Sequence, residues 1–73
     1  MAESVYKVIE LVGTSDQSWE KAAAAAVATA SQSLKDLRIA EVEEMDMHLS
    51  GAEILTYRVK LRISFRYHGK DEE

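Results

Sequence analysis

The chain has 73 residues, no cysteine and a formal net charge of −4, with 13 acidic residues against nine basic ones. This length makes a single domain over residues 1–73. The composition excludes disulfides, thiolate metal sites and the overall basic charge of a typical nucleic-acid binder. No segment has the pattern of a leader or the ~20 apolar residues that a bilayer requires, so we expect a cytoplasmic protein with no nucleic-acid or membrane partner.

The first predicted element is a strand over residues 5–12, after a polar tail at residues 1–4. Its sequence, VYKVIELV, is apolar and rich in β-branched residues, which is typical of a strand covered on both faces. Gly13 interrupts this run. The following Thr14-Ser15-Asp16-Gln17 has the form of a capping box and predicts the start of a helix.

A helix is predicted over about residues 16–36, because this segment contains five consecutive alanines and neither glycine nor proline. Its apolar residues recur every three or four positions, which places them on one stripe. The stripe is mostly alanine, so we expect the helix to lie very close to the element on which it packs. Its members are Trp19, Ala23, Ala26, Val27, Ala30, Leu34 and Leu37.

Residues 38–67 are predicted to form a long hairpin that turns at Ser50-Gly51-Ala52, followed by a polar tail at residues 68–73. The second arm, residues 54–67, alternates strictly, which predicts a strand with one buried and one polar face. Leu55, Val59 and Ile63 are among the apolar set. The first arm changes phase at Glu43-Glu44, which indicates a β-bulge or sharp bend.

The length of this hairpin predicts self-association. A second arm of about 14 residues is ~45 Å long, whereas a helix of about 20 residues reaches only ~30 Å. One helix therefore cannot cover the apolar face of the hairpin, and the remainder would be an aggregation hazard in a monomer. Because a domain this small is usually marginal alone and cannot form disulfides, we expect an obligate oligomer.

The sequence resembles the dodecin family. The resemblance begins with VYKVIELVGTS at residues 5–15 and Ser18-Trp19-Glu20, and it covers about residues 5–67 in the same order of elements. It implies an α+β fold, namely a β-α-β-β subunit whose three-stranded antiparallel sheet wraps around one helix. It further implies a non-enzymatic homododecamer that forms a hollow shell. The remaining matching segments are Leu34-Lys35-Asp36-Leu37-Arg38, Tyr57-Arg58-Val59-Lys60-Leu61 and Ser64-Phe65.

The resemblance also implies a flavin site, but this chain departs from it. Dodecins of the best-known type stack a flavin on a tryptophan of the second strand and hold it with an arginine and a glutamine. These three positions fall on Ile39, Asp46 and Arg58. Isoleucine has no π-face on which a flavin can stack. We therefore expect a member of the branch that lacks the flavin tryptophan, with FMN, FAD or riboflavin bound only in the alternative of a storage dodecin with a non-aromatic site.

The parity of the two hairpin arms suggests how these positions are filled instead. With a three-residue loop at Gly51-Ala52-Glu53, Asp46 lies opposite Arg58 and Glu44 opposite Lys60, so cross-strand salt bridges would close the site. A slip of two residues would instead pair Glu44 with Arg58. The first register also pairs Leu49 with Leu55, Met47 with Tyr57 and Met45 with Val59.

The acidic residues of the first arm are weak candidates for a cation site. A ring of carboxylates at a symmetry axis would suit a hard divalent cation such as Ca²⁺ or Mg²⁺, and a channel could also take monovalent cations. The more ordinary interpretation is a solvated acidic stretch. The residues are Glu41, Glu43, Glu44 and Asp46. No nucleophile–base pair or phosphate loop appears, so we predict a container or scaffold and not an enzyme.

Overall fold

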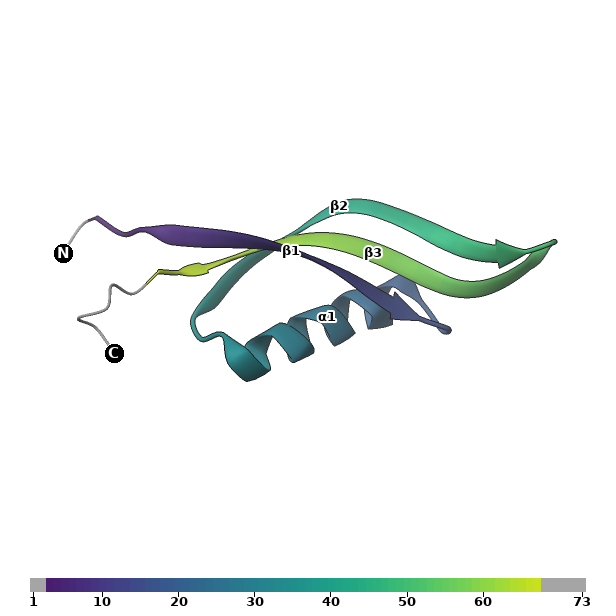
Figure 1. The fold of residues 1–73 in the computed structure, drawn as a ribbon, viewed down its shortest axis with the longest axis horizontal. Helices are drawn as coiled ribbons and strands as arrows, with labels where there is room; N and C mark the ends of the chain where they lie inside the picture. Colours follow the sequence, from purple (N-terminus) through teal and green to yellow (C-terminus); the bar gives the residue numbers. More distant parts are fainter. Residues whose placement is uncertain (1–2, 68–73) are drawn as a thin grey trace.

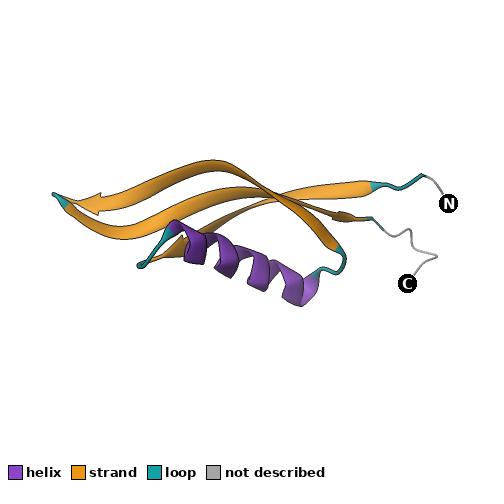
Figure 2. Cartoon of the chain, turned by 180° about the vertical axis from the view of Figure 1, so that it is seen from behind, coloured by secondary structure: helices purple, strands orange, loops and turns teal. Residues whose placement is uncertain are grey.

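The computed structural model describes residues 3–67 and contains a three-stranded antiparallel sheet with one helix on one face (Figures 1 and 2). The elements are β1 (Tyr6–Ser15), α1 (Trp19–Ser33), β2 (Leu37–Ser50) and β3 (Glu53–Arg66). The strand order is β1-β3-β2, so β3 is central. This is the predicted β-α-β-β subunit. Both predicted polar tails lie largely outside the described residues.

β1 extends past the predicted break at Gly13. The glycine does not end the strand; it leaves room for α1, which passes close to it. A Cβ at Gly13 would overlap the carbonyl oxygen of Ala22. The predicted capping box is wrong: Thr14 belongs to β1, and the N-cap of α1 is Ser18, whose Oγ accepts a hydrogen bond from the backbone of Lys21 at 3.0 Å. The predicted cover on both faces of β1 is also wrong for the single chain, in which Val12 is exposed.

α1 is shorter than predicted and packs through alanine. Its buried residues are Ala22, Ala26 and Ala30, spaced by four positions, so the helix can lie close to the sheet. The helix ends because Leu34 is extended and Asp36 has a positive φ of 63°. Within residues 3–67, no helix is both long and apolar enough to span a membrane.

The core lies between these alanines and the middle of β3, where Val59, Leu61 and Ile63 are each 1% exposed. This confirms the alternation predicted for the second arm. Leu55 belongs to the same apolar face, yet it is 39% exposed, because α1 does not reach the end of the hairpin. The chain is 53 Å long and only 20 Å by 15 Å across, and the hairpin projects well beyond the start of α1 (Figure 1).

The hairpin register confirms most of the predicted pairs. Asp46 lies opposite Arg58 and Glu44 opposite Lys60, so the alternative register is wrong. A register shift between Val42 and Glu44 confirms the predicted bulge. The pairing of Leu49 with Leu55 is wrong, because a further shift after His48 sets Leu49 opposite Ile54. The turn contains two residues and not three. Met47 pairs with Tyr57 and Met45 with Val59 as predicted.

Candidate functional site

The face of the sheet that points away from α1 is strongly charged. The residues of β3 that alternate with the buried core point to this side. Between residues 58 and 62 the central strand supplies three cations, and both neighbouring strands supply acids. We call this surface the charged face; its charged residues are Glu10, Glu41, Glu43, Glu44, Asp46, Arg58, Lys60 and Arg62.

Asp46 and Arg58 form a two-point ion pair at the end of the charged face that is nearest the hairpin turn. The Nε of Arg58 lies 2.7 Å from Oδ1 of Asp46, and Nη2 lies 2.9 Å from Oδ2. This planar geometry is among the stronger forms of hydrogen-bonded ion pair. The hydrogen bonds from Arg58 lower the pKa of Asp46 below its ordinary value. Both side chains are about half exposed, so the pair stays in contact with water.

The other cations of β3 pair with both neighbouring strands. Arg62 lies 3.5 Å from Glu43 of β2, and Lys60 lies 4.0 Å from Glu10 of β1. The predicted salt bridge between Glu44 and Lys60 is wrong: the two residues are opposite each other, but within residues 3–67 Glu44 forms no ion pair. The ammonium of Lys60 lies instead near Glu10 of β1, the strand on the other edge of β3.

A shallow hollow of about 240 Å³ surrounds the Asp46–Arg58 pair. Its lining combines two acids and two bases with the aliphatic side chain of Val12, and it consists of Val12, Glu44, Asp46, Arg58 and Lys60. Ile39 does not belong to it. Ile39 is paired with Ser64, which is about 20 Å along β3 from Arg58. Within one copy, the structure brings together Asp46 and Arg58 but not all three positions that the resemblance implies.

The candidate cation ligands follow one another along β2 and do not converge in one copy. The part of the chain that the structure describes contains no group of three or more histidine, aspartate or glutamate side chains that could hold a metal ion. Asp46 is held by Arg58, and Glu43 lies beside Arg62. Glu41 and Glu44 are exposed. A cation bound by these residues would therefore need further oxygen ligands, from water or from another copy of the chain.

Trp19 contacts the pair of strand residues Asp46 and Arg58 from the helix side of the sheet. The sequence did not predict this contact. The Nε1 of Trp19 donates a hydrogen bond to the backbone carbonyl of Asp46 at 3.1 Å. Its ring meets that of Tyr57 edge-on, with 5.1 Å between centroids and 75° between planes. The only sequence signal was an isolated tryptophan at a helix start. Trp19 also borders an apolar pocket of about 220 Å³ with Glu20, Ala23, Val42, Met45 and Val59.

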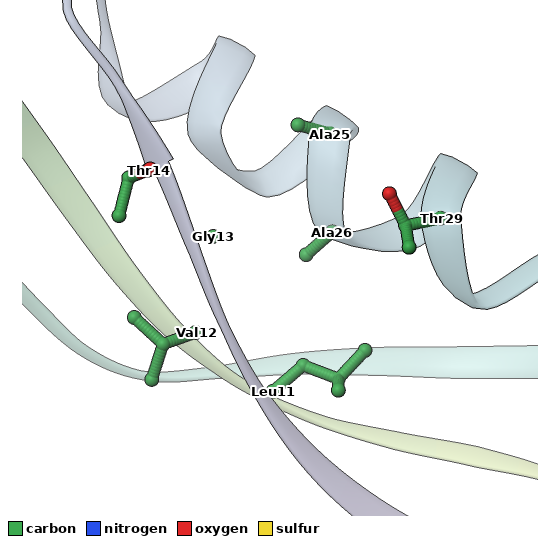
Figure 3. Close-up of a pocket in the computed structure, with 7 residues that line it drawn as sticks. All are labelled: Leu11, Val12, Gly13, Thr14, Ala25, Ala26 and Thr29. Atoms are coloured by element: carbon green, nitrogen blue, oxygen red, sulfur yellow. The ribbon is translucent and has the colours of Figure 1, made fainter.

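A further hollow lies between β1 and α1 and has little chemistry of its own (Figure 3). Its only polar side chains are the hydroxyls of Thr14 and Thr29. No charged side chain lines it, so it offers nothing that would select a charged ligand. The remaining lining residues are Leu11, Val12, Gly13, Ala25 and Ala26.

Comparison with known proteins gives one consistent family. The family model described as Dodecin matches residues 5–68. A calcium dodecin from Mycobacterium tuberculosis is 54% identical over 63 residues, which are 86% of this chain and 89% of that protein. A dodecin from Thermus thermophilus is 42% identical over 62 residues, 85% of this chain and 90% of that protein.

Solved structures agree with these sequence matches. A dodecin from Streptomyces coelicolor is similar with a TM-score of 0.90 at 31% identity, over 96% of this chain and 100% of that one. The crystal structure of the calcium dodecin from Mycobacterium tuberculosis, described as calcium chelating and as having a novel calcium-binding site, is similar with a TM-score of 0.81 at 51% identity. That match covers 92% of this chain and 96% of the other.

Proposed function

The chain belongs to the dodecin family of small, non-enzymatic binding proteins, and from this premise we propose that it forms a hollow homododecameric shell that binds divalent cations, calcium first, and does not depend on flavin. We assign the shell a container or scaffold role in the cytoplasm. The observation that carries flavin independence is the Asp46–Arg58 ion pair, in which two positions of the implied flavin site satisfy each other.

The uncovered hairpin supports the assembly. The helix side of β2 and β3 exposes a set of large apolar side chains that begins beside the first turns of α1 and extends past the start of the helix. A soluble monomer rarely exposes a patch of this kind, and neighbouring copies would bury it. These residues include Val42, Met45, Met47, Leu49 and Leu55. Light scattering tests the assembly: twelve chains of 8.2 kDa give about 98 kDa, and a monomer or dimer would contradict it.

Two features argue against flavin dependence. The position that would carry the stacking tryptophan is Ile39, an exposed aliphatic residue. The two positions that would supply polar contacts, Asp46 and Arg58, satisfy each other. A flavin would have to separate this pair and would find no aromatic face in return, so its binding would lose both stacking and polar contacts.

The cation assignment rests on the similarity to a calcium dodecin and on the acids of β2. Ca²⁺ takes six to eight oxygen ligands in flexible geometry, which is more than one copy of this chain offers. Glu41 and Glu44 are exposed acids without an ion-pair partner in residues 3–67. In a symmetric shell, the same carboxylate repeats around each axis, so few acids per copy can form a complete site.

Calorimetric titration of the assembled protein with CaCl₂, MgCl₂ and KCl tests the cation assignment. Glu41→Gln and Glu44→Gln should weaken calcium binding at least about tenfold, because each loses a charged oxygen ligand in every copy. Glu53→Gln, which removes an equal charge at the hairpin turn, is the matched control and should bind as the unchanged protein does. Absence of calcium heat at millimolar concentration would refute the assignment.

Titration with riboflavin and FMN distinguishes the proposed flavin-independent protein from the alternative, a flavin-storage dodecin with a non-aromatic site. Bound flavin would tumble with the large assembly, so the anisotropy of its fluorescence would rise. We expect no rise at micromolar protein and ligand. A clear rise in that range would overturn flavin independence, and the assembly and cation measurements would be judged separately.

A further inference from the structure

The rung formed by Asp46 and Arg58 is contacted from both faces of the sheet. On the charged face, Arg58 holds the Asp46 carboxylate with hydrogen bonds of 2.7 and 2.9 Å. On the helix side, Trp19 Nε1 donates to the Asp46 carbonyl at 3.1 Å. The indole also packs edge-on against Tyr57, the neighbour of Arg58 in β3. One side chain therefore contacts β2 and β3 at adjacent positions.

This arrangement matters because the ion pair depends on the relative position of the two strands. The aspartate side chain is short, so its carboxylate follows the backbone of β2 closely. A displacement of β2 by about 1 Å would break at least one of the two parallel hydrogen bonds. Exposed ion pairs are otherwise weak, since both side chains lose freedom on pairing and water screens them. A fixed backbone keeps the two side chains within reach, so pairing requires no further ordering of the strands.

Trp19 is itself held in place. It is the first residue of α1, directly after the N-cap Ser18, and the backbone of Ala22 donates to the Ser18 carbonyl at 3.1 Å. Ala22 is completely buried against the sheet. The indole therefore extends from the most firmly packed turn of the helix to the edge strand β2.

We propose that Trp19 is a positioning residue for the Asp46–Arg58 pair. From the helix side, it fixes β2 relative to β3. The carboxylate and the guanidinium therefore stay paired, and the hollow around them stays closed to other ligands. The consequence for ligands rests on the proposed function. Release of the Trp19 contact would free a carboxylate for cations and a guanidinium for anions, and would thereby loosen the selectivity of the charged face.

The Nε–H of Arg58 reports this pairing directly. It donates to Oδ1 of Asp46 at 2.7 Å, so its NMR resonance follows the geometry of the pair. Measurement on the assembled protein, without any ligand, keeps this test independent of calcium and flavin binding.

We would measure this resonance by NMR of ¹⁵N-labelled protein, with the signal assigned by Arg58→Gln. Trp19→Phe retains an aromatic ring beside Tyr57 but removes the indole N–H, and we expect the Arg58 Nε–H resonance to shift toward that of an unpaired arginine. Tyr57→Phe retains the ring contact and the N–H donor, so it is the matched control and should leave the resonance in place. An unchanged resonance in assembled Trp19→Phe would overturn the proposal.

The reciprocal experiment leaves Trp19 intact. Coupling between two sites is mutual, so Arg58→Gln should shift the indole N–H resonance and the fluorescence of Trp19, the only tryptophan in the chain. Lys60→Gln removes the same charge two residues along the strand and should leave both signals in place. If light scattering shows that Trp19→Phe does not assemble, the comparison of Arg58→Gln with Lys60→Gln tests the proposal by itself. Equal signals from Arg58→Gln and the unchanged protein refute the proposal.

Discussion

Gly13→Ala tests the close approach of α1 to the sheet, which is the least adjustable contact of the fold. The new Cβ would lie 3.0 Å from the carbonyl carbon of Ala22 and 3.1 Å from the Cβ of Ala26, and would overlap the Ala22 oxygen. Two of these atoms are backbone atoms and cannot rotate away. The helix must therefore move outward and lose contact with Val59 and Leu61.

Such overpacking costs about 1–3 kcal/mol. Replacing glycine by alanine recovers about 0.4–1 kcal/mol by restricting the unfolded chain. Because the overlap is with backbone atoms, we take the upper part of the overpacking range, about 2–3 kcal/mol, so the net loss is about 1–2.6 kcal/mol per chain. This loss corresponds to a Tm lower by about 4–20 °C for a domain of this size. The assay is thermal unfolding of the assembled protein followed by circular dichroism, with the assembly checked by light scattering at equal chain concentration.

Gly51→Asn is the matched control for the loss of a glycine. Gly51 has a φ of 60°, and a Cβ there would meet nothing within 4 Å. Asparagine tolerates this left-handed conformation better than most residues, so Gly51→Asn should unfold near the temperature of the unchanged protein. If Gly13→Ala also unfolds within about 2 °C of it, the reasoning about close packing of α1 is refuted.

Three other outcomes follow from the same contacts. Leu61→Ala, in the buried part of β3, should lower the free energy of unfolding by about 2–5 kcal/mol in chemical denaturation, because it leaves a cavity in the core. Asp36→Val should cost about 1–2 kcal/mol relative to Asp36→Asn, since a β-branched residue is strained at a φ of 63°. The pairing of Asp46 with Arg58 lowers the folded-state pKa of Asp46, so its stabilising effect is present above the unfolded pKa of aspartate, about 3.9, and is lost as the pH falls through the folded value. The difference in stability between the unchanged protein and Asp46→Asn should therefore be constant near neutral pH and disappear in acid; a difference that persists in acid would contradict this explanation.

The sequence predicts features that depend on strict periodicity. The alternation of β3 identifies Val59, Leu61 and Ile63 as core, and the phase change in β2 identifies the bulge at Glu43. Family membership confirms the prediction of a non-enzymatic protein. These signals extend over many residues and do not depend on the position of a single atom.

Features that depend on a single contact are not visible in the pattern. Gly13 reads as a strand break, but it lies inside β1 because α1 passes directly over it. Lys60 lies opposite Glu44 yet is nearer to Glu10, because a central strand offers its cations two acidic neighbours and the pattern of one hairpin considers only one. The contact of Trp19 with Asp46 spans 27 residues and requires the actual path of the helix start.

The bulge at Glu43 explains how one strand can serve both the assembly and the charged face. Before the bulge, Val42 lies opposite Leu61 on the helix side; after it, Met45 lies opposite Val59 on the same side. Without the extra residue, alternation would turn one of these two segments toward the charged face. The insertion keeps the apolar side of β2 continuous from Ala40 to Met47. It also brings the consecutive acids Glu43 and Glu44 onto the charged face, where strict alternation would allow only one of them. The same local irregularity therefore preserves the apolar surface that we expect neighbouring copies to cover and increases the density of carboxylates on the opposite side.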